Sequence, residues 1–205
     1  MLLAFGCVVA DAMRWKVSAD AAIINGGFLR GGRVYQPENV NARELLNGVN
    51  VESIPEDPAC FQFKRSDIER ECPFMCKTVV LAIQGKDLQD TLEQQLALPK
   101  PSGAFPHVSG MRIVFSDSKP KHKRISSVDM LLPNGEWEPL DAKATYSLAV
   151  SDFMAAGGDG VTALKRAAVV SVPDLPLVRD AVVDYLKYNK FLMLKLEGRL
   201  MNEKI

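Results

Sequence analysis

Histidine is scarce in this chain of 205 residues, where His107 and His122 are the only two. A two-metal hydrolytic centre needs several histidine and aspartate ligands on converging loops, and this pair cannot supply them. His107 lies at the start of an expected strand and His122 lies in a basic turn, so we expect structural or solvated roles for both. The sequence therefore predicts no metal site and no catalytic residue within this chain.

Cysteine is also sparse, and the four cysteines follow no framework spacing. They are Cys7, Cys60, Cys72 and Cys76. No Cys-x-x-Cys pair is present for zinc or redox chemistry. Cys72 and Cys76 are close enough in sequence to approach each other around Pro73-Phe74, but we expect buried free thiols.

Neither sign of charge is in excess, because 25 basic residues balance 25 acidic ones. A chain without a positive excess has no long-range field that attracts polyanions, which argues against a nucleic-acid partner. A single local arginine can still bind one phosphate group. The charge balance therefore leaves mononucleotides open as partners.

Long apolar runs are missing as well. Residues 1–10 are apolar but too few to span a membrane, and no basic residue precedes them as it would in a signal peptide. We expect them to open a buried helix that continues to Trp15, and a chain that starts inside a helix looks truncated. A composition of 47% apolar and 24% charged residues is typical of one globular domain. The sequence does not indicate a cellular compartment.

The most informative segment is residues 151–160, Ser-Asp-Phe-Met-Ala-Ala-Gly-Gly-Asp-Gly, which follows an alternating, strand-like run. Gly157 and Gly158 allow close backbone approach and positive φ angles, which turn Asp159 away from a regular element. An aromatic ring at Phe153 and a carboxylate six residues later suit a nucleoside, because the ring stacks on a base and the carboxylate accepts hydrogen bonds from sugar hydroxyls. The alternative is a plain loop with a packed phenylalanine.

A second segment repeats this design. Residues 20–30 predict a buried strand that ends in Asn25, two glycines and then Arg30. Pro73-Phe74 offers another aromatic ring after a turn signal, and residues 103–110 form a glycine-bounded start of a strand.

Taken together and in this order, these segments resemble the C-terminal domain of the 5'-nucleotidase family, which includes UDP-sugar hydrolases and cyclic-nucleotide phosphodiesterases. The matching segments are Asp11-Ala12, residues 25–30, Pro73-Phe74, residues 103–110 and residues 153–160, with a closing Gly198-Arg199-Leu200. The resemblance covers nearly the whole chain, and the joint order is more specific than any one segment.

The resemblance implies a fold and a partner domain. It implies an α+β domain with a layered α/β/β/α arrangement of mixed, mostly antiparallel sheets over residues 1–205, in which part of residues 34–60 is a loop insertion. It also implies an N-terminal metallophosphoesterase domain that holds two divalent metal ions and is absent from this chain. On this view the chain binds a nucleotide or nucleoside, and itself needs no cofactor.

Site roles follow residue by residue from the resemblance. Phe74 and Phe153 match the two aromatics that sandwich the nucleobase. Asp159 matches the carboxylate that binds ribose hydroxyls, and Asn25 and Arg30 match groups that reach toward ribose and phosphate. Gly157 and Gly158 complete the predicted substrate site.

Two departures stand out. Phe28 occupies a position where many relatives have a third glycine or a small residue, so it either narrows the site or packs outward. The family commonly has a further arginine shortly before the Asp-Ala helix, and this chain has Met1-Leu-Leu-Ala there.

Two other readings remain at this point. One is a non-catalytic or regulatory nucleotide binder that kept the fold without turnover. The other is a dinucleotide-binding oxidoreductase, suggested by Gly26-Gly27 and Gly31-Gly32 after a strand. Its glycines lack the Gly-x-Gly-x-x-Gly spacing, and no helix is expected directly after them.

Periodicity predicts the remaining elements. A helix is expected to begin with a capping box formed by Ser66 and Glu69. Strands are expected over residues 77–84, 111–116 and 124–132, and helices over residues 86–98 and 177–194. Asn134-Gly135 has the signature of a hairpin turn.

Overall fold

The structure is a computed structural model that describes residues 4–31, 63–99, 101–170, 174–189 and 198–203. The suggested insertion at residues 34–60 lies outside the described residues. Within them the α-helices are α1 (Ala4–Val17), α3 (Arg65–Glu71), α4 (Gly85–Ala97), α5 (Asp152–Ala155) and α6 (Val178–Asn189). The strands are β1 (Ala21–Asn25), β2 (Thr78–Gln84), β3 (Pro106–Ser109), β4 (Met111–Phe115), β5 (Ile125–Leu131), β6 (Trp137–Pro139), β7 (Thr145–Ser151), β8 (Ala168–Val170) and β9 (Leu200–Asn202).

The strands form two mixed sheets. The larger sheet has the order β3-β1-β7-β2-β8, and the smaller one has the order β6-β5-β4-β9. Each sheet contains one parallel pair, β1 with β7 and β4 with β9, while the other pairs are antiparallel. The α+β class with mixed, mostly antiparallel sheets is confirmed.

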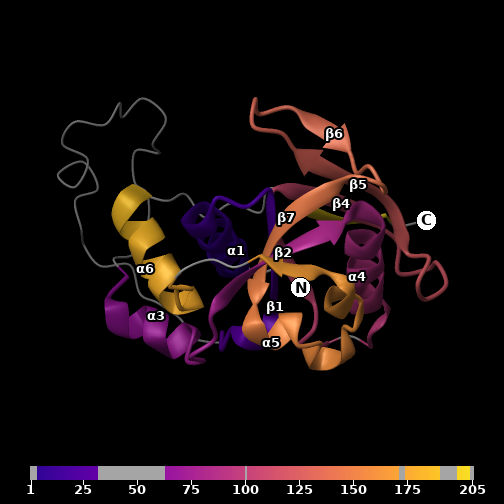
Figure 1. Ribbon diagram of the computed structural model, residues 1–205. Coiled ribbons are helices and arrows are strands. Elements are labelled where there is room, and N and C mark those ends of the chain that lie inside the picture. Colours follow the sequence, from indigo (N-terminus) through magenta and orange to yellow (C-terminus); the bar gives the residue numbers. More distant parts are fainter. Residues whose placement is uncertain (1–3, 32–62, 100, 171–173, 190–197, 204–205) are drawn as a thin grey trace, which may run out of the picture.

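Helices cover the larger sheet from both sides (Figure 1). α1, α3 and α6 lie together on one side, while α4 lies on the other side with the smaller sheet. α5 lies at one end of the larger sheet, close to the end of β1. This end of the sheet becomes important for the site.

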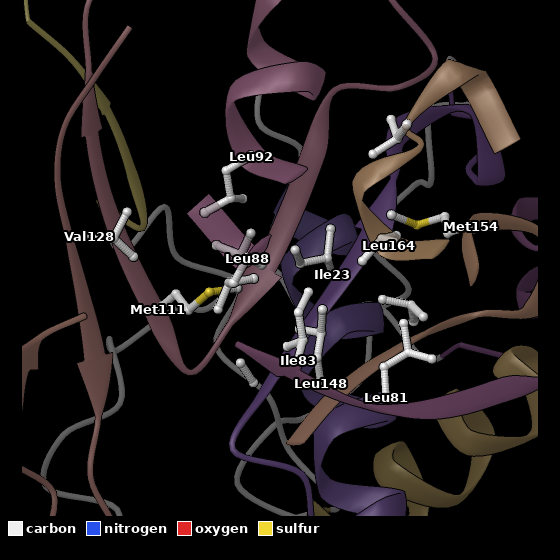
Figure 2. Close-up of a cluster of buried hydrophobic side chains, with 14 of the residues drawn as sticks. Ile23, Leu81, Ile83, Leu88, Leu92, Met111, Val128, Leu148, Met154 and Leu164 are labelled. Carbon is white, nitrogen blue, oxygen red and sulfur yellow. The ribbon is translucent and has the colours of Figure 1, made fainter. Parts of the chain in front are cut away.

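The buried side chains form two clusters that follow from the alternation of β1 and β7. Ile23 and Leu148 point into the first cluster, together with Leu88 and Leu92 of α4. Figure 2 shows that the α4 leucines lie between Met111 and Val128 of the smaller sheet and the strands of the larger sheet. The four-residue spacing of the leucines places them on one buried helix face, as the sequence predicts.

The second cluster lies on the opposite face of the larger sheet. Ala22 and Ile24 alternate with the residues that face the first cluster, and α1 and α6 cover them with Met13 and Val182. All four side chains are fully buried. The expected buried N-terminal helix is therefore confirmed for residues 4–17.

The predicted helix start at Ser66 is wrong. Helix α3 begins at Arg65, and Lys64 is its N-cap. The Asp67 carboxylate accepts the Lys64 backbone N–H at 2.9 Å, and the Lys64 carbonyl accepts the Asp67 N–H. Asp67 therefore provides the reciprocal bond that we had assigned to Glu69.

Most other predicted boundaries agree to within a residue or two, including the hairpins at residues 116–124 and 132–136. The last helix is described from Val178 to Asn189, and residues 190–194 of the prediction lie outside the described residues. The short strands β8 and β9 were not predicted, since three residues carry too little periodicity.

Candidate nucleoside site

The predicted site residues start from one end of the larger sheet. Thr78 at the start of β2 pairs with Ser151 at the end of β7, and the Asp152 N–H donates to the Lys77 carbonyl at 2.9 Å. β1 runs parallel to β7, so its last residue, Asn25, lies at the same end of the sheet. The segments that carry Phe74, Phe153 and Asn25 therefore lie at one end of three neighbouring strands.

Phe153 lies in α5, the short turn expected after β7. The Ser151 hydroxyl caps this helix by accepting the Met154 N–H at 3.2 Å, which is the usual role of serine at an N-cap. Met154 points into the core, whereas Phe153 is 45% exposed. Phe153 is therefore not packed in the core.

The glycine-rich loop that follows needs its glycines for two different reasons. Gly157 has φ +82° and lies against the alkyl chain of Lys165, while a side chain at Gly158 would overlap the Phe153 ring. Asp159 itself has φ 56°, a conformation that non-glycine residues adopt at a cost. Gly158 therefore packs against the Phe153 ring, and the positive φ of Asp159 sets the direction of its side chain.

Asp159 and Asn25 meet across this edge. The Asn25 Nδ2 donates to the Asp159 Oδ2 at 2.8 Å, although the two residues are 134 positions apart. Asn25 is 5% exposed, and its Oδ1 is buried without a hydrogen-bond partner among the described residues. A buried acceptor without a donor is costly, and five other buried side-chain atoms of the described residues share this state, among them the Thr78 hydroxyl and the His107 Nδ1.

Backbone contacts fix the direction of Asn25. Gly26–Phe28 form one 3-10 turn directly after β1. The Gly26 N–H donates to the Phe105 carbonyl at 2.8 Å and the Gly27 N–H to the Gly103 carbonyl at 2.6 Å. A Cβ at Gly27 would lie 3.3 Å from the Gly103 Cα, so the two backbones approach closely. A single 3-10 turn offers no helix N-terminus for a pyrophosphate, which argues against the dinucleotide reading.

Phe74 lies in the segment between α3 and β2 and is 36% exposed. The Arg30 guanidinium lies over its ring, 4.7 Å from the centroid, and the Phe28 ring lies 5.9 Å away at 45°. A cation over an aromatic face is attracted by the ring quadrupole. Arg30, which is predicted to reach toward phosphate, is exposed and lies beside Phe74, one of the two predicted base-stacking residues.

His107 of β3 lies next to the turn that follows Asn25. It pairs with Ile24 on β1, is 1% exposed, and would be overlapped by any side chain at Gly6 of α1. Burial lowers the pKa of His107 to about 4, so the ring is neutral at physiological pH. The structural role expected for His107 is consistent with this placement, and exposed His122 lies in the hairpin turn.

Cys7, Cys72 and Cys76 form no disulfide, as expected, but only Cys7 and Cys72 are buried, and Cys76 is half-buried. Burial raises the pKa of Cys72 to about 12, and burial together with Asp152 raises that of Cys76 to about 11. Both thiols are therefore protonated and weakly reactive near neutral pH. Cys60 lies outside the described residues.

Among the described residues, no cluster of three or more His, Cys, Asp or Glu side chains is arranged to hold a metal ion. No helix in the same ranges is both long and apolar enough to cross a membrane.

The structure therefore brings together two pairs of predicted residues, Asn25 with Asp159 and Arg30 with Phe74. The sandwiching of one base by Phe74 and Phe153 stays a prediction. Sequence reasoning missed the contact between Phe28 and Phe74 and the support of Gly157 by Lys165. The unusual ring at position 28 was the available signal for the first of these contacts.

Comparison with known proteins assigns the chain to a family. The family model described as "5'-nucleotidase, C-terminal domain" matches residues 3–166. The chain is 30% identical over 169 residues to the trifunctional nucleotide phosphoesterase protein YfkN of Bacillus subtilis, covering 80% of this chain and 10% of that protein. It is 28% identical over 191 residues to Protein 5NUC of Lutzomyia longipalpis, covering 87% of this chain and 33% of the relative.

A solved structure agrees with these relatives. The crystal structure of a 5'-nucleotidase precursor from Thermus thermophilus superposes with a TM-score of 0.76 at 30% identity, covering 98% of this chain and 36% of that one. The chain thus spans about a third or less of the length of these three proteins. It belongs to the family of 5'-nucleotidase C-terminal domains.

Proposed function

We propose that this chain recognises a nucleoside or nucleotide and serves as the substrate-recognition domain of a 5'-nucleotidase-type hydrolase. The observation that carries the proposal is the bond between Asn25 and Asp159, which joins a buried amide to an exposed carboxylate beside an exposed aromatic ring. An exposed carboxylate that is held in one orientation can accept charge-assisted hydrogen bonds from a ligand.

Each group has a matching part of a nucleoside. Asp159 uses Oδ2 for Asn25, and its Oδ1 has no protein partner within the described part of the chain. A ribose hydroxyl can donate to this oxygen in a charge-assisted hydrogen bond. The Asn25 Nδ2 holds this carboxylate in place. Together they form a polar pair that can bind sugar hydroxyls.

The aromatic and basic groups complete the match. Phe74 and Phe153 are both partly exposed, and each presents a ring on which a base can stack. The Arg30 guanidinium at the edge of this arrangement can bond two phosphate oxygens at once. The chain supplies recognition groups for all three parts of a nucleotide.

Hydrolysis requires groups beyond those described here. We propose that a metallophosphoesterase domain with two divalent metal ions, which the family resemblance implies, acts on the nucleotide that this domain holds. The Bacillus subtilis relative is named a nucleotide phosphoesterase. The chain alone is expected to bind adenosine weakly and to hydrolyse nothing. Metal-dependent phosphatase activity that depends on residues of this chain would contradict the proposal.

Calorimetry with adenosine on the Asp159→Asn variant tests the proposal. Asparagine tolerates the positive φ angle of 56° and keeps an oxygen for the Asn25 amide, but it removes the charge. Loss of charge-assisted hydrogen bonds should weaken binding by roughly 1.5–3 kcal/mol, about tenfold to more than a hundredfold. The melting temperature should change little, because Asp159 is exposed.

Asp174→Asn is the matched control, because Asp174 is also an exposed aspartate with positive φ (49°). It should bind adenosine like the wild type. A 2'- or 3'-deoxyadenosine should lose less than adenosine when Asp159 is changed, if the missing hydroxyl is one of the contacts. Equal adenosine affinity of the Asp159 and Asp174 variants would refute the assigned role.

A further inference from the structure

Phe28 differs from the other aromatic residues near the site because it is buried and still touches an exposed ring. It is 3% exposed and belongs to the cluster between the larger sheet and helices α1 and α6. Its ring centroid lies 5.9 Å from that of Phe74, which is 36% exposed. One ring is thus held in the core, and the other extends from it toward solvent.

The backbone explains why Phe28 and Arg30 both reach Phe74. Leu29 is extended, with φ −94° and ψ 135°, so the side chains on either side of it point the same way. Leu29 itself is buried. The Arg30 N–H donates to the Glu71 carbonyl at 3.0 Å, which ties this segment to the end of α3, three residues before Phe74.

Phe74 has little other support from its own segment. Residues 73–77 form no helix and only an isolated bridge at Lys77, and neighbouring Met75 is 61% exposed. A half-exposed ring in such a segment keeps rotamer freedom, which is lost when a ligand stacks on it. A fixed partner that contacts the ring reduces this loss before the ligand arrives.

We propose that Phe28 is a positioning residue that fixes the orientation of the Phe74 ring for stacking on a nucleobase. The proposal rests on the proposed function, because it assigns the base to Phe74. Phe28 does not touch the ligand: it is buried and contacts Phe74 from the core. The tilted geometry at 45° is among the arrangements that aromatic pairs favour.

A double-mutant cycle tests this inference with adenosine as the probe. The variants are Phe28→Leu, Phe74→Leu and the combination of both, and each is measured well below its melting temperature. Phe28→Leu keeps an apolar side chain in the core but removes the ring contact. We expect it to weaken adenosine binding about three- to tenfold in the wild-type background, the range that an aromatic pair supports.

The combination separates positioning from a general loss of stability. Once Phe74 is replaced, Phe28→Leu should have no further effect on affinity, because it acts through that ring. Val182→Ala is the control for the core, since Val182 lies in the same cluster on α6, which carries no predicted site residue. It should lower the melting temperature and leave the adenosine affinity unchanged.

The outcomes distinguish the inference from the proposed function. If the wild type binds adenosine and Phe74→Leu weakens binding, the proposed function stands. In that case, an unchanged affinity of Phe28→Leu, or an equal loss in both backgrounds, overturns the positioning role. If the wild type binds no adenosine, the proposed function fails and the positioning role fails with it.

Discussion

Two polar pairs join distant parts of this chain, and they are satisfied to different degrees. Arg199 makes two hydrogen bonds to the Asp11 carboxylate, at 2.7 and 2.9 Å, and a third to the Val108 carbonyl at 3.0 Å. Asn25 makes one side-chain bond to Asp159 and leaves a buried oxygen unpartnered among the described residues. The first pair fastens the segment before β9 to α1, and the second lies at the open end of the larger sheet.

We propose that the difference separates groups that hold the fold from groups that bind a ligand. A bidentate arginine–carboxylate pair with a further carbonyl contact needs nothing else. The Asn25–Asp159 pair carries two energetic costs. Asn25 is 5% exposed and has a buried oxygen without a donor, and Asp159 has a positive φ angle. Variants in the two regions should therefore affect different measurements.

The largest difference in stability is expected between two phenylalanine variants, one in the smaller sheet and one at the proposed site. Phe115 of β4 is 3% exposed, so Phe115→Ala should lower the free energy of unfolding by about 3–5 kcal/mol by leaving a cavity. Phe153 is 45% exposed, and Phe153→Ala should cost only about 1 kcal/mol of stability. Urea unfolding measures both, and adenosine binding by the folded Phe153 variant should be lost. Similar destabilisation by both would place Phe153 in the core.

The next effect concerns the satisfied pair. Arg199→Met removes the guanidinium and leaves the Asp11 carboxylate without it, which should lower the free energy of unfolding by roughly 2–4 kcal/mol. Arg166→Met is the control, because Arg166 bonds Asp87 and Asp90 at 2.7 Å each while its side chain is 49% exposed. That exposed arrangement should cost less than about 1 kcal/mol. Equal losses would show that the half-buried Arg199–Asp11 pair contributes no more than the exposed pairs of Arg166.

The effect that is smallest at neutral pH is a pH dependence from His107, which develops only as the pH falls. Its folded-state pKa of about 4 lies below the ordinary value of 6.5, so the unfolded chain binds the proton first as the pH falls. Stability should therefore decrease from pH 6.5 to about 4, with a contribution of at most about 1.4 kcal/mol per pH unit. The decrease should be shallower in His107→Gln and unchanged in His122→Asn. Identical slopes in all three proteins would show that His107 does not contribute.

The sequence predicts the regular parts of this molecule well because their signals are local. The leucine spacing of residues 88, 92 and 96 fixes the buried face of α4, and the β-branched run of β2 requires a buried strand. The helix start at Arg65 escaped prediction because Asp67 and Glu69 are both acidic residues in a capping position, and only the backbone shows which one bonds. Local patterns do not decide between close alternatives.

The site is predictable in a different way. Its glycines, Asp159 and the two exposed phenylalanines occur in recognisable segments, and the family assignment joins those segments in one fold. The contacts between the segments depend on strand order and on one 3-10 turn, which no local pattern specifies. This is why the side on which Phe28 packs could not be predicted, although its presence was conspicuous.

The side-chain amide of Asn25 provides the most direct measurement. Its NMR signals should shift progressively and saturate as adenosine is added, because the ligand is expected to bond to the exposed Asp159 carboxylate, to which the Asn25 Nδ2 donates. The side-chain amide of Asn202, which bonds Asp117 on the smaller sheet, should stay unchanged. Adenosine binding that shifts other residues and leaves the Asn25 amide in place would contradict the site proposed here.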